Sequence, residues 1–147
     1  MAKPLIIGCG NPDRGDDAAG LLVVKRLRSM GIAAEEHHGE GLALMEAWSG
    51  AGSVILIDAV ITGTAPGAIS VWDAQTAPVS RDAFRASTHS FGVAEAVELA
   101  RALGRLPALL VIYGIEGRNF EPGSQPAPEV LAAVEEVARR IAKETEI

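Results

Sequence analysis

The stretch Gly8-Cys9-Gly10-Asn11-Pro12-Asp13-Arg14-Gly15-Asp16-Asp17-Ala18-Ala19-Gly20 decides how this chain begins to fold. The apolar run 4–7 before it has the character of a strand that a sheet buries on both faces. A helical pattern covers residues 17–30, so the stretch is predicted to turn a buried strand into a helix. Two adjacent carboxylates at such a turn, Asp16 and Asp17, indicate a place for a cation.

The glycines of this turn suggest a dinucleotide-binding fingerprint, but their spacing does not fit one. After Gly8 and Gly10 the GxGxxG pattern requires a glycine at position 13, where this chain has Asp13. Carboxylates at the turn would repel a pyrophosphate and cancel the attraction of the helix N-terminus. The turn is therefore not expected to bind a nucleotide.

Helix capping explains one of the two adjacent carboxylates. An aspartate at an N-cap accepts an amide hydrogen bond, which is worth about 1 kcal/mol. Neighbouring residues at a helix start point about 100° apart, so Asp16 and Asp17 cannot both cap the same helix. The second carboxylate needs another role.

Apolar runs alternate with segments of helical period along the chain. This alternation predicts a mostly parallel sheet that is covered by helices on both faces. The connection 61–67 is too short for a crossover helix, so the fourth run is predicted to be an antiparallel strand at the sheet edge. The runs are 4–8, 33–38, 53–60, 68–72 and 108–113, and the helical segments are 17–30, 41–50, 91–104 and 127–144.

Length and composition predict one globular domain that spans residues 1–147, because 48% of the residues are hydrophobic and the chain can bury a single core. The net charge of −6 argues against nucleic acid and anionic membranes as partners. No run approaches the ~20 apolar residues of a membrane span, and the N-terminus lacks a signal-peptide pattern. With Cys9 as the single cysteine there is no internal disulfide, so we expect a cytoplasmic protein.

Three polar residues are expected to meet outside the carboxyl ends of the strands, where open α/β sheets bind ligands. Asp17 follows the first strand, Asp58 lies near the end of the third, and His89 precedes the third helix. Each has an alternative structural role: Asp17 as a cap, Asp58 as an acid satisfied by backbone amides, and His89 as a surface or capping histidine. If they meet, two carboxylates and an imidazole suit zinc, nickel or another divalent ion.

The residues of several motifs together resemble the hydrogenase maturation proteases. The resemblance covers nearly the whole chain, and its specificity comes from the order and spacing of the motifs. They are the GxGNxxxGDDxxG turn, the strand that ends at Asp58-Ala59, Thr88-His89-Ser90-Phe91-Gly92, Tyr113-Gly114-Ile115-Glu116-Gly117 and Pro128-Glu129-Val130. The fold implied is a three-layer α/β/α sandwich with a mostly parallel five-stranded sheet and one antiparallel edge strand.

The resemblance also implies a function and a partner. Family members are endopeptidases that remove the C-terminal extension of a nickel-iron hydrogenase large-subunit precursor, with nickel in the precursor as the recognition element. Other divalent metals are expected to bind in vitro, and the protein is expected to be a monomer. An alternative of another class is a proteolytically inactive module of the same fold that only binds a metal or a metalloprotein.

The family's metal-contacting and catalytic positions correspond to Asp17, Asp58 and His89 in this chain. Many members carry glutamate at the first of these positions, and Asp17 is one methylene shorter. The remaining carboxylate of the turn, Asp16, is then assigned to the N-cap. The segment 36–41 departs from the Asp-Gly-Gly-Thr of some members, so substrate contacts there are not carried over.

Several other polar and aromatic residues receive structural assignments. The two histidines after the second run alternate faces, so they are interpreted as surface residues or as residues that support the site. Cys9 is interpreted as a small buried hydrophobe, with nucleophilic catalysis as a weaker alternative. Charged residues after the fifth strand are expected to be solvated loop charges, with substrate binding as the alternative, and Phe120 either anchors a partner or packs under its own loop. The residues concerned are His37, His38, Cys9, Glu116, Arg118 and Phe120.

Overall fold

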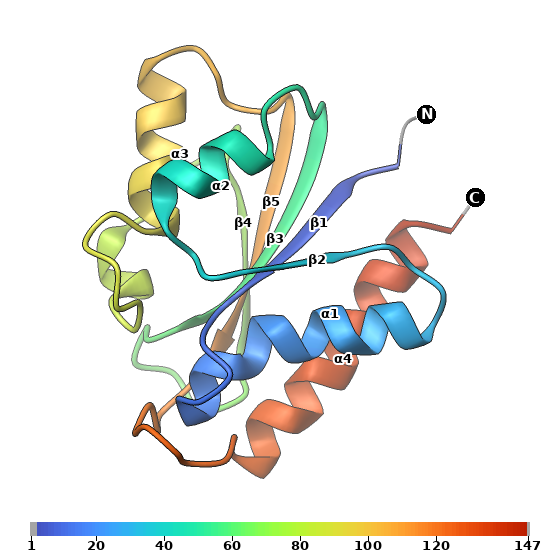
Figure 1. Ribbon diagram of the computed structural model, residues 1–147, viewed down its shortest axis with the longest axis vertical. Coiled ribbons are helices and arrows are strands. Elements are labelled where there is room, and N and C mark those ends of the chain that lie inside the picture. Colours follow the sequence, from blue (N-terminus) through green and yellow to red (C-terminus); the bar gives the residue numbers. More distant parts are fainter. Residues whose placement is uncertain (1–2, 147) are drawn as a thin grey trace.

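The computed structural model describes residues 3–146 and contains a five-stranded sheet in the order β2-β1-β3-β5-β4 (Figure 1). The four neighbouring pairs are parallel except β4 with β5. The strands are β1 (Leu5–Cys9), β2 (Glu35–His37), β3 (Ser53–Val60), β4 (Ile69–Asp73) and β5 (Leu109–Glu116). The predicted antiparallel edge strand is therefore confirmed, and β5 lies between it and β3.

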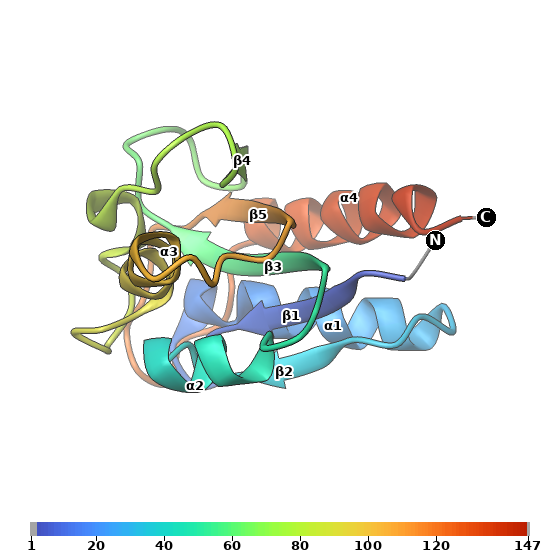
Figure 2. The ribbon, with the colours of Figure 1, turned by 90° about the horizontal axis from the view of Figure 1, so that it is seen from above.

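Four α-helices cover the two faces of the sheet in pairs, α1 with α4 and α2 with α3 (Figure 2). They are α1 (Ala19–Ser29), α2 (Gly41–Ala47), α3 (Val93–Ala102) and α4 (Pro128–Glu144). Two short 3-10 helices, η1 (Gly15–Ala18) and η2 (Arg81–Phe84), complete the elements. The α/β/α sandwich predicted from the sequence is confirmed. Among residues 3–146 no helix combines the length and apolar character that a bilayer crossing requires.

The alternation of side chains along β3 decides which face each residue serves. Leu56 and Val60 pack into the core under α2 and α3, whereas Ile57 and Ala59 pack into the core under α1 and α4. Because side chains alternate along a strand, Asp58 points toward the α2 and α3 face. Cys9 at the end of β1 belongs to the same core.

The start of α1 packs closely against the centre of the sheet because two glycines meet there. A Cβ atom on Gly8 would lie 2.1 Å from the carbonyl oxygen of Gly20, and one on Gly20 would lie 2.3 Å from the carbonyl oxygen of Cys9. Neither contact is sterically allowed, so only glycine lets the helix approach this near. These two glycines therefore permit a close approach of the helix backbone to the strand.

The structure differs from the sequence prediction at a few boundaries. The predicted helix 17–30 is divided into η1 and α1, η2 was not predicted, and β5 continues to Glu116 instead of ending at residue 113. The last difference matters for the site, because it makes Glu116 a strand residue at the carboxyl edge of the sheet.

Candidate active site

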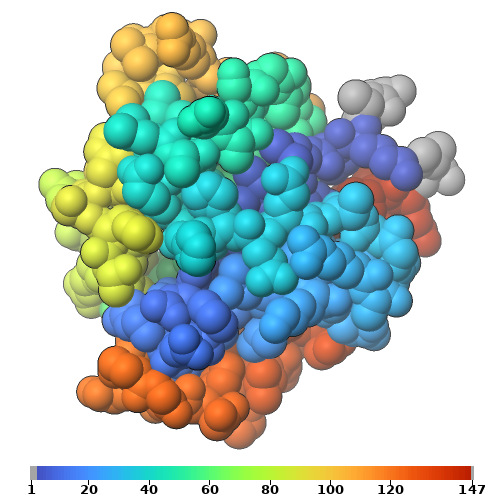
Figure 3. All heavy atoms as spheres, viewed as in Figure 1, coloured from blue at the N-terminus to red at the C-terminus, as the bar shows by residue number. Residues whose placement is uncertain are grey.

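Four segments lie at the edge of the sheet where the parallel strands end. These segments are 10–18, 61–68, 85–92 and 117–127. In the space-filling view the N-terminal turn, coloured blue, lies between the yellow segment that precedes α3 and the orange loop that follows β5 (Figure 3). The candidate residues all come from this edge.

Asp17 lies on η1, with only 5% of its surface exposed. Its Oδ2 accepts a hydrogen bond from Nη1 of Arg14 at 3.1 Å. Burial raises the pKa of Asp17 to about 6, although the Arg14 charge and, more weakly, the His89 charge oppose the rise. The carboxylate is thus kept in a place where its negative charge is costly.

Asp58 is equally buried, and its charge is coupled to that of Asp17. Its Oδ1 accepts the amide of Ala59 at 2.8 Å, and β5 presents Gly114 opposite it. Burial raises the pKa of Asp58 well above its ordinary value, and the negative charge of Asp17 raises it further. Two acids that disfavour each other's ionised form are a carboxylate pair that a cation would stabilise.

His89 lies half-buried on the segment between η2 and α3. The backbone amide of His89 donates to Oγ of Ser87 at 3.1 Å. Its charge is close enough to help lower the pKa of Asp17 and, after the amides of Leu42 and Ala43, that of Glu40. The structure therefore places His89 in the surroundings of the carboxylate pair.

The three predicted residues do not form a finished metal cage. In the part of the chain that the structure describes, no three His, Cys, Asp or Glu side chains lie close enough to hold a metal ion. The assignment of Asp17, Asp58 and His89 as ligands stays a prediction.

The expectation that Asp16 caps the helix is wrong. Asp16 is fully buried, and no side chain caps η1 or α1. Its Oδ2 accepts the amides of Arg118 and Asn119 at 2.8 and 2.9 Å, and its Oδ1 accepts the amide of Ala127 at 2.8 Å. Asp16 therefore fixes the loop between β5 and α4 to the N-terminal turn.

The expectation that Glu116 is a solvated loop charge is also wrong. Glu116 is 3% exposed, and its carboxylate accepts hydrogen bonds from the amides of Thr62 and Gly63 and from the hydroxyls of Thr62 and Thr64. Glu116 thus orders the connection from β3 to β4 beside Asp58. The apolar run of β5 resumes at Ile115 after Gly114, and extending the strand past residue 113 on that signal would have placed Glu116 at its end.

Cys9 does not have the surroundings of a nucleophile. Its side chain is buried, and burial raises the pKa of the thiol well above its ordinary value, with Asp58 and Asp17 raising it further. A catalytic cysteine requires the opposite shift, because the thiolate is the reactive form. The structure therefore supports Cys9 as a small core residue.

The aromatic and histidine residues near the turn follow their structural interpretations. Phe120 packs partly buried against the core under α1 and α4, as expected of a ring under its own loop. His38 is exposed, and Nδ1 of His37 accepts the amide of Gly39 at 3.0 Å. Both histidines border a hollow of about 250 Å³ that also reaches Gly10.

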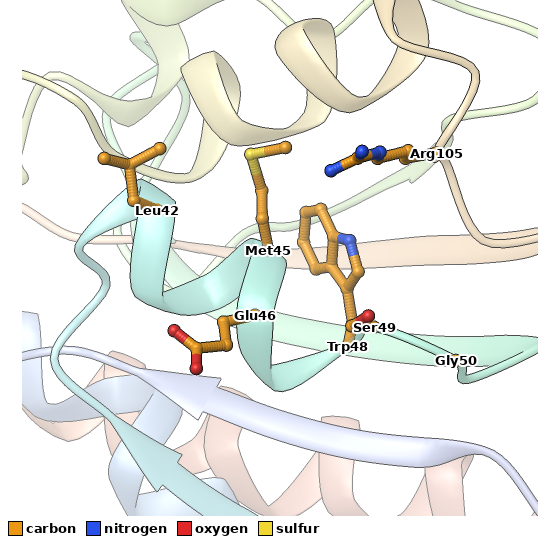
Figure 4. Close-up of a pocket in the computed structure, with 7 residues that line it drawn as sticks. All are labelled: Leu42, Met45, Glu46, Trp48, Ser49, Gly50 and Arg105. Carbon is orange, nitrogen blue, oxygen red and sulfur yellow. The ribbon is translucent and has the colours of Figure 1, made fainter.

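A larger hollow of about 600 Å³ lies along α2 and the end of α3. Met45 and Trp48 line it together with Arg105, whose side chain extends over the indole (Figure 4). None of Asp17, Asp58 and His89 lines this hollow. This hollow is therefore separate from the two buried carboxylates.

The contribution of Asp17 to stability is expected to become more favourable when the pH is lowered from 7 to 5. The folded state, with a pKa of about 6, takes up a proton in this range, while an unfolded aspartate stays ionised. The free energy of unfolding is expected to rise by roughly 1 kcal/mol and to be lost again as pH increases through 6. Urea unfolding at both pH values measures the change.

Asp17→Asn is the control for this pH dependence. The pKa of His37 is lowered chiefly by burial, so its titration in the same range reduces stability on acidification. This term is present in both proteins, so the difference between wild type and Asp17→Asn reports the titration of Asp17 together with the rise in the pKa of Asp58 that the Asp17 charge causes. Equal pH slopes in the two proteins would contradict the buried-acid interpretation.

Comparison with known proteins places this geometry in a family. The family model described as HycI, hydrogenase maturation protease, matches residues 39–144, which include Asp58 and His89 but not Asp17. The hydrogenase expression/formation protein HoxM of Azotobacter vinelandii is 28% identical over 145 residues, which cover 95% of this chain and 70% of that protein.

Solved structures show the same fold. The [NiFe] hydrogenase maturation protease HybD of Thermococcus kodakarensis matches with a TM-score of 0.75 and 24% identity, covering 99% of this chain and 100% of that one. An endopeptidase from Escherichia coli matches with a TM-score of 0.81 and 22% identity, covering 99% and 95%. The fold and the match over most of the sequence agree, and this chain belongs to the hydrogenase maturation protease family.

Proposed function

We propose that this protein is an endopeptidase that removes the C-terminal extension from the large-subunit precursor of a nickel-iron hydrogenase. Membership of the hydrogenase maturation protease family supports the class of reaction. The observation that carries the proposal is that Asp17 and Asp58 are both buried at the carboxyl edge of the sheet and that the charge of Asp17 raises the pKa of Asp58. In this proposal nickel already bound in the precursor is what the protease recognises.

The donor set fits nickel by its chemistry. Two carboxylates provide hard oxygen ligands and His89 provides an imidazole, a mixture that nickel and zinc accept. Burial raises the pKa of both acids, so a divalent cation would remove an electrostatic strain that the protein otherwise carries. No three such side chains lie close enough to hold a metal ion among residues 3–146, so in this proposal the precursor would have to supply further ligands.

Each residue then has a definite part in the proposed reaction. Asp17, Asp58 and His89 would hold the precursor at its nickel and so fix the scissile peptide at the carboxyl edge. The nickel, when bound, supplies Lewis-acid polarisation of a carbonyl or a bound water. The buried carboxylates of Asp16 and Glu116 accept hydrogen bonds from the surrounding loops and so keep these loops in place.

Incubation of the purified protein with precursor tests the proposal. Nickel-loaded precursor is expected to lose its C-terminal extension, which mass spectrometry detects, whereas nickel-free precursor is expected to stay intact. Equal cleavage of both forms would overturn nickel recognition. Stable binding of the nickel-loaded form without any cleavage would instead show an inactive binding module.

A further inference from the structure

Arg14 joins the three segments that surround Asp17. A single guanidinium nitrogen, Nη1, donates to Oδ2 of Asp17 at 3.1 Å and to the carbonyl oxygen of Ala86 at 3.1 Å. The guanidinium carbon lies 5.9 Å from the centre of the Phe120 ring, within the range of a cation–π contact. Arg14 therefore links the N-terminal turn to the segment that carries His89 and to the loop after β5.

The positive charge of Arg14 matters because few other positive groups offset the negative charges of Asp17 and Asp58. Arg14 is the cation that forms a salt bridge with Asp17, and no salt bridge reaches Asp58 among residues 3–146. The side chain of Arg14 is 21% exposed and that of Asp17 is 7% exposed, so water screens this pair only partly. One positive charge thus faces two buried acids.

A divalent cation and the Arg14 guanidinium would compete for the same carboxylate oxygen. Oδ2 of Asp17 is directed at Nη1, while the single hydrogen bond to Asp58 comes from an amide and carries no charge. Nη1 occupies one lone-pair position of Oδ2, and the positive charge of the guanidinium repels a second cation there, so a metal ion that takes the position facing Nη1 must displace Arg14. Binding of the cation at that position requires that the pair opens.

We propose that Arg14 is a positioning residue that occupies Oδ2 of Asp17 until a divalent cation displaces it, and that holds the segment of His89 beside the turn meanwhile. This inference rests on the proposed function, because it takes Asp17 as a ligand. It goes beyond that function by assigning a resident competitor to the site. The sequence alone does not indicate this role for Arg14.

Titration of the isolated protein with Ni²⁺ alone at pH 8, followed by calorimetry, tests the competition. Arg14→Met removes the charge and keeps an apolar chain of similar length, so Ni²⁺ is expected to bind about tenfold more tightly than to wild type. Arg14→Lys keeps a positive charge near Asp17 and is expected to stay near the wild-type affinity. In the double variant Arg14→Met with Asp17→Asn, the gain is expected to disappear.

Arg85→Met is the matched control. Arg85 is exposed, lies next to Ala86 and forms no salt bridge within the described part of the chain, so its removal costs the same charge without touching Asp17. It is expected to leave the Ni²⁺ affinity within twofold of wild type. Thermal unfolding of each variant checks that the fold is retained.

Two independent readouts separate this inference from the proposed function. An unchanged or weaker Ni²⁺ affinity in Arg14→Met, or no binding by any variant, overturns the role of Arg14, even if wild type cleaves nickel-loaded precursor. Tighter binding that depends on Asp17 supports that role, even if wild type cleaves no precursor and the proposed function fails. An equal gain in Arg85→Met would reduce the effect to net charge and would also overturn it.

Discussion

Asp16→Ala is expected to lower the free energy of unfolding by about 4 kcal/mol, one of the two largest effects we predict for a single side chain here. The carboxylate of Asp16 accepts three backbone amides from the loop between β5 and α4, and it is completely buried. Removing it leaves buried donors without partners, at about 1–3 kcal/mol for each. Urea unfolding measures the loss.

Asp16→Asn is the matched control for this prediction. An asparagine keeps the size and one carbonyl acceptor, but its amide group cannot accept the hydrogen bonds that the other carboxylate oxygen received. We expect about half of the loss seen for Asp16→Ala. A loss below about 1 kcal/mol in Asp16→Ala would show that Phe120 and its neighbours hold the loop without the carboxylate.

Asp17→Asn is expected to reduce precursor processing to less than about one hundredth of the wild-type rate. The substitution keeps the shape of the side chain and removes the negative charge that would bind a cation. The stability at pH 7 is expected to change by less than about 1 kcal/mol, because a buried charge with a raised pKa is lost together with its partial pairing to Arg14. Cleavage of nickel-loaded precursor and thermal unfolding measure the two effects.

Asp17→Glu tests whether the site requires only a negative charge at this position or also the shorter length of aspartate. Glutamate stands at this position in many proteins that the sequence resembles, so the longer carboxylate is expected to retain processing. Wild-type processing by Asp17→Asn would show that Asp17 is not a ligand. Loss of processing in both variants, with the fold intact, would instead show that the site requires the shorter side chain.

The two aspartates therefore have opposite expected phenotypes although they are adjacent. Asp16 is needed for the stability of the loop after β5, and Asp17 is needed for the proposed reaction. The sequence divides them into one structural and one functional residue; the structure shows a structural role for Asp16, and the functional role of Asp17 stays a prediction. What changes is the structural role, from a local cap to a link between distant parts of the chain.

Local patterns were sufficient to predict the order and type of the main elements. The apolar run 53–60 corresponds to β3, and the stripe of Val130, Val134, Val137 and Ile141 is buried on α4. The short connection 61–67 predicted an antiparallel edge strand, because a crossover helix needs more residues. A carboxylate inside an apolar strand also marked Asp58 as special, because burying an acid is costly.

The partners of the buried charges were decided by the tertiary structure. The amides that Asp16 accepts lie 102 to 111 residues further along the chain, and the partners of Glu116 lie 52 to 54 residues before it. Periodicity and spacing describe neighbours within a few residues and carry no information on such pairs. They exist because β1, β3 and β5 are parallel and end at the same edge of the sheet, where the segments that follow these three strands meet.

The sequence by itself thus determined the order and type of the main strands and helices, and that Asp17 and Asp58 stand near the ends of buried strands. Only the tertiary structure decided what each acid faces: backbone amides for Asp16 and Glu116, Arg14 for Asp17, and the charge of Asp17 for Asp58. The physical reason is that secondary structure follows from local periodicity, whereas the electrostatic environment of a buried carboxylate depends on groups that chain packing brings close.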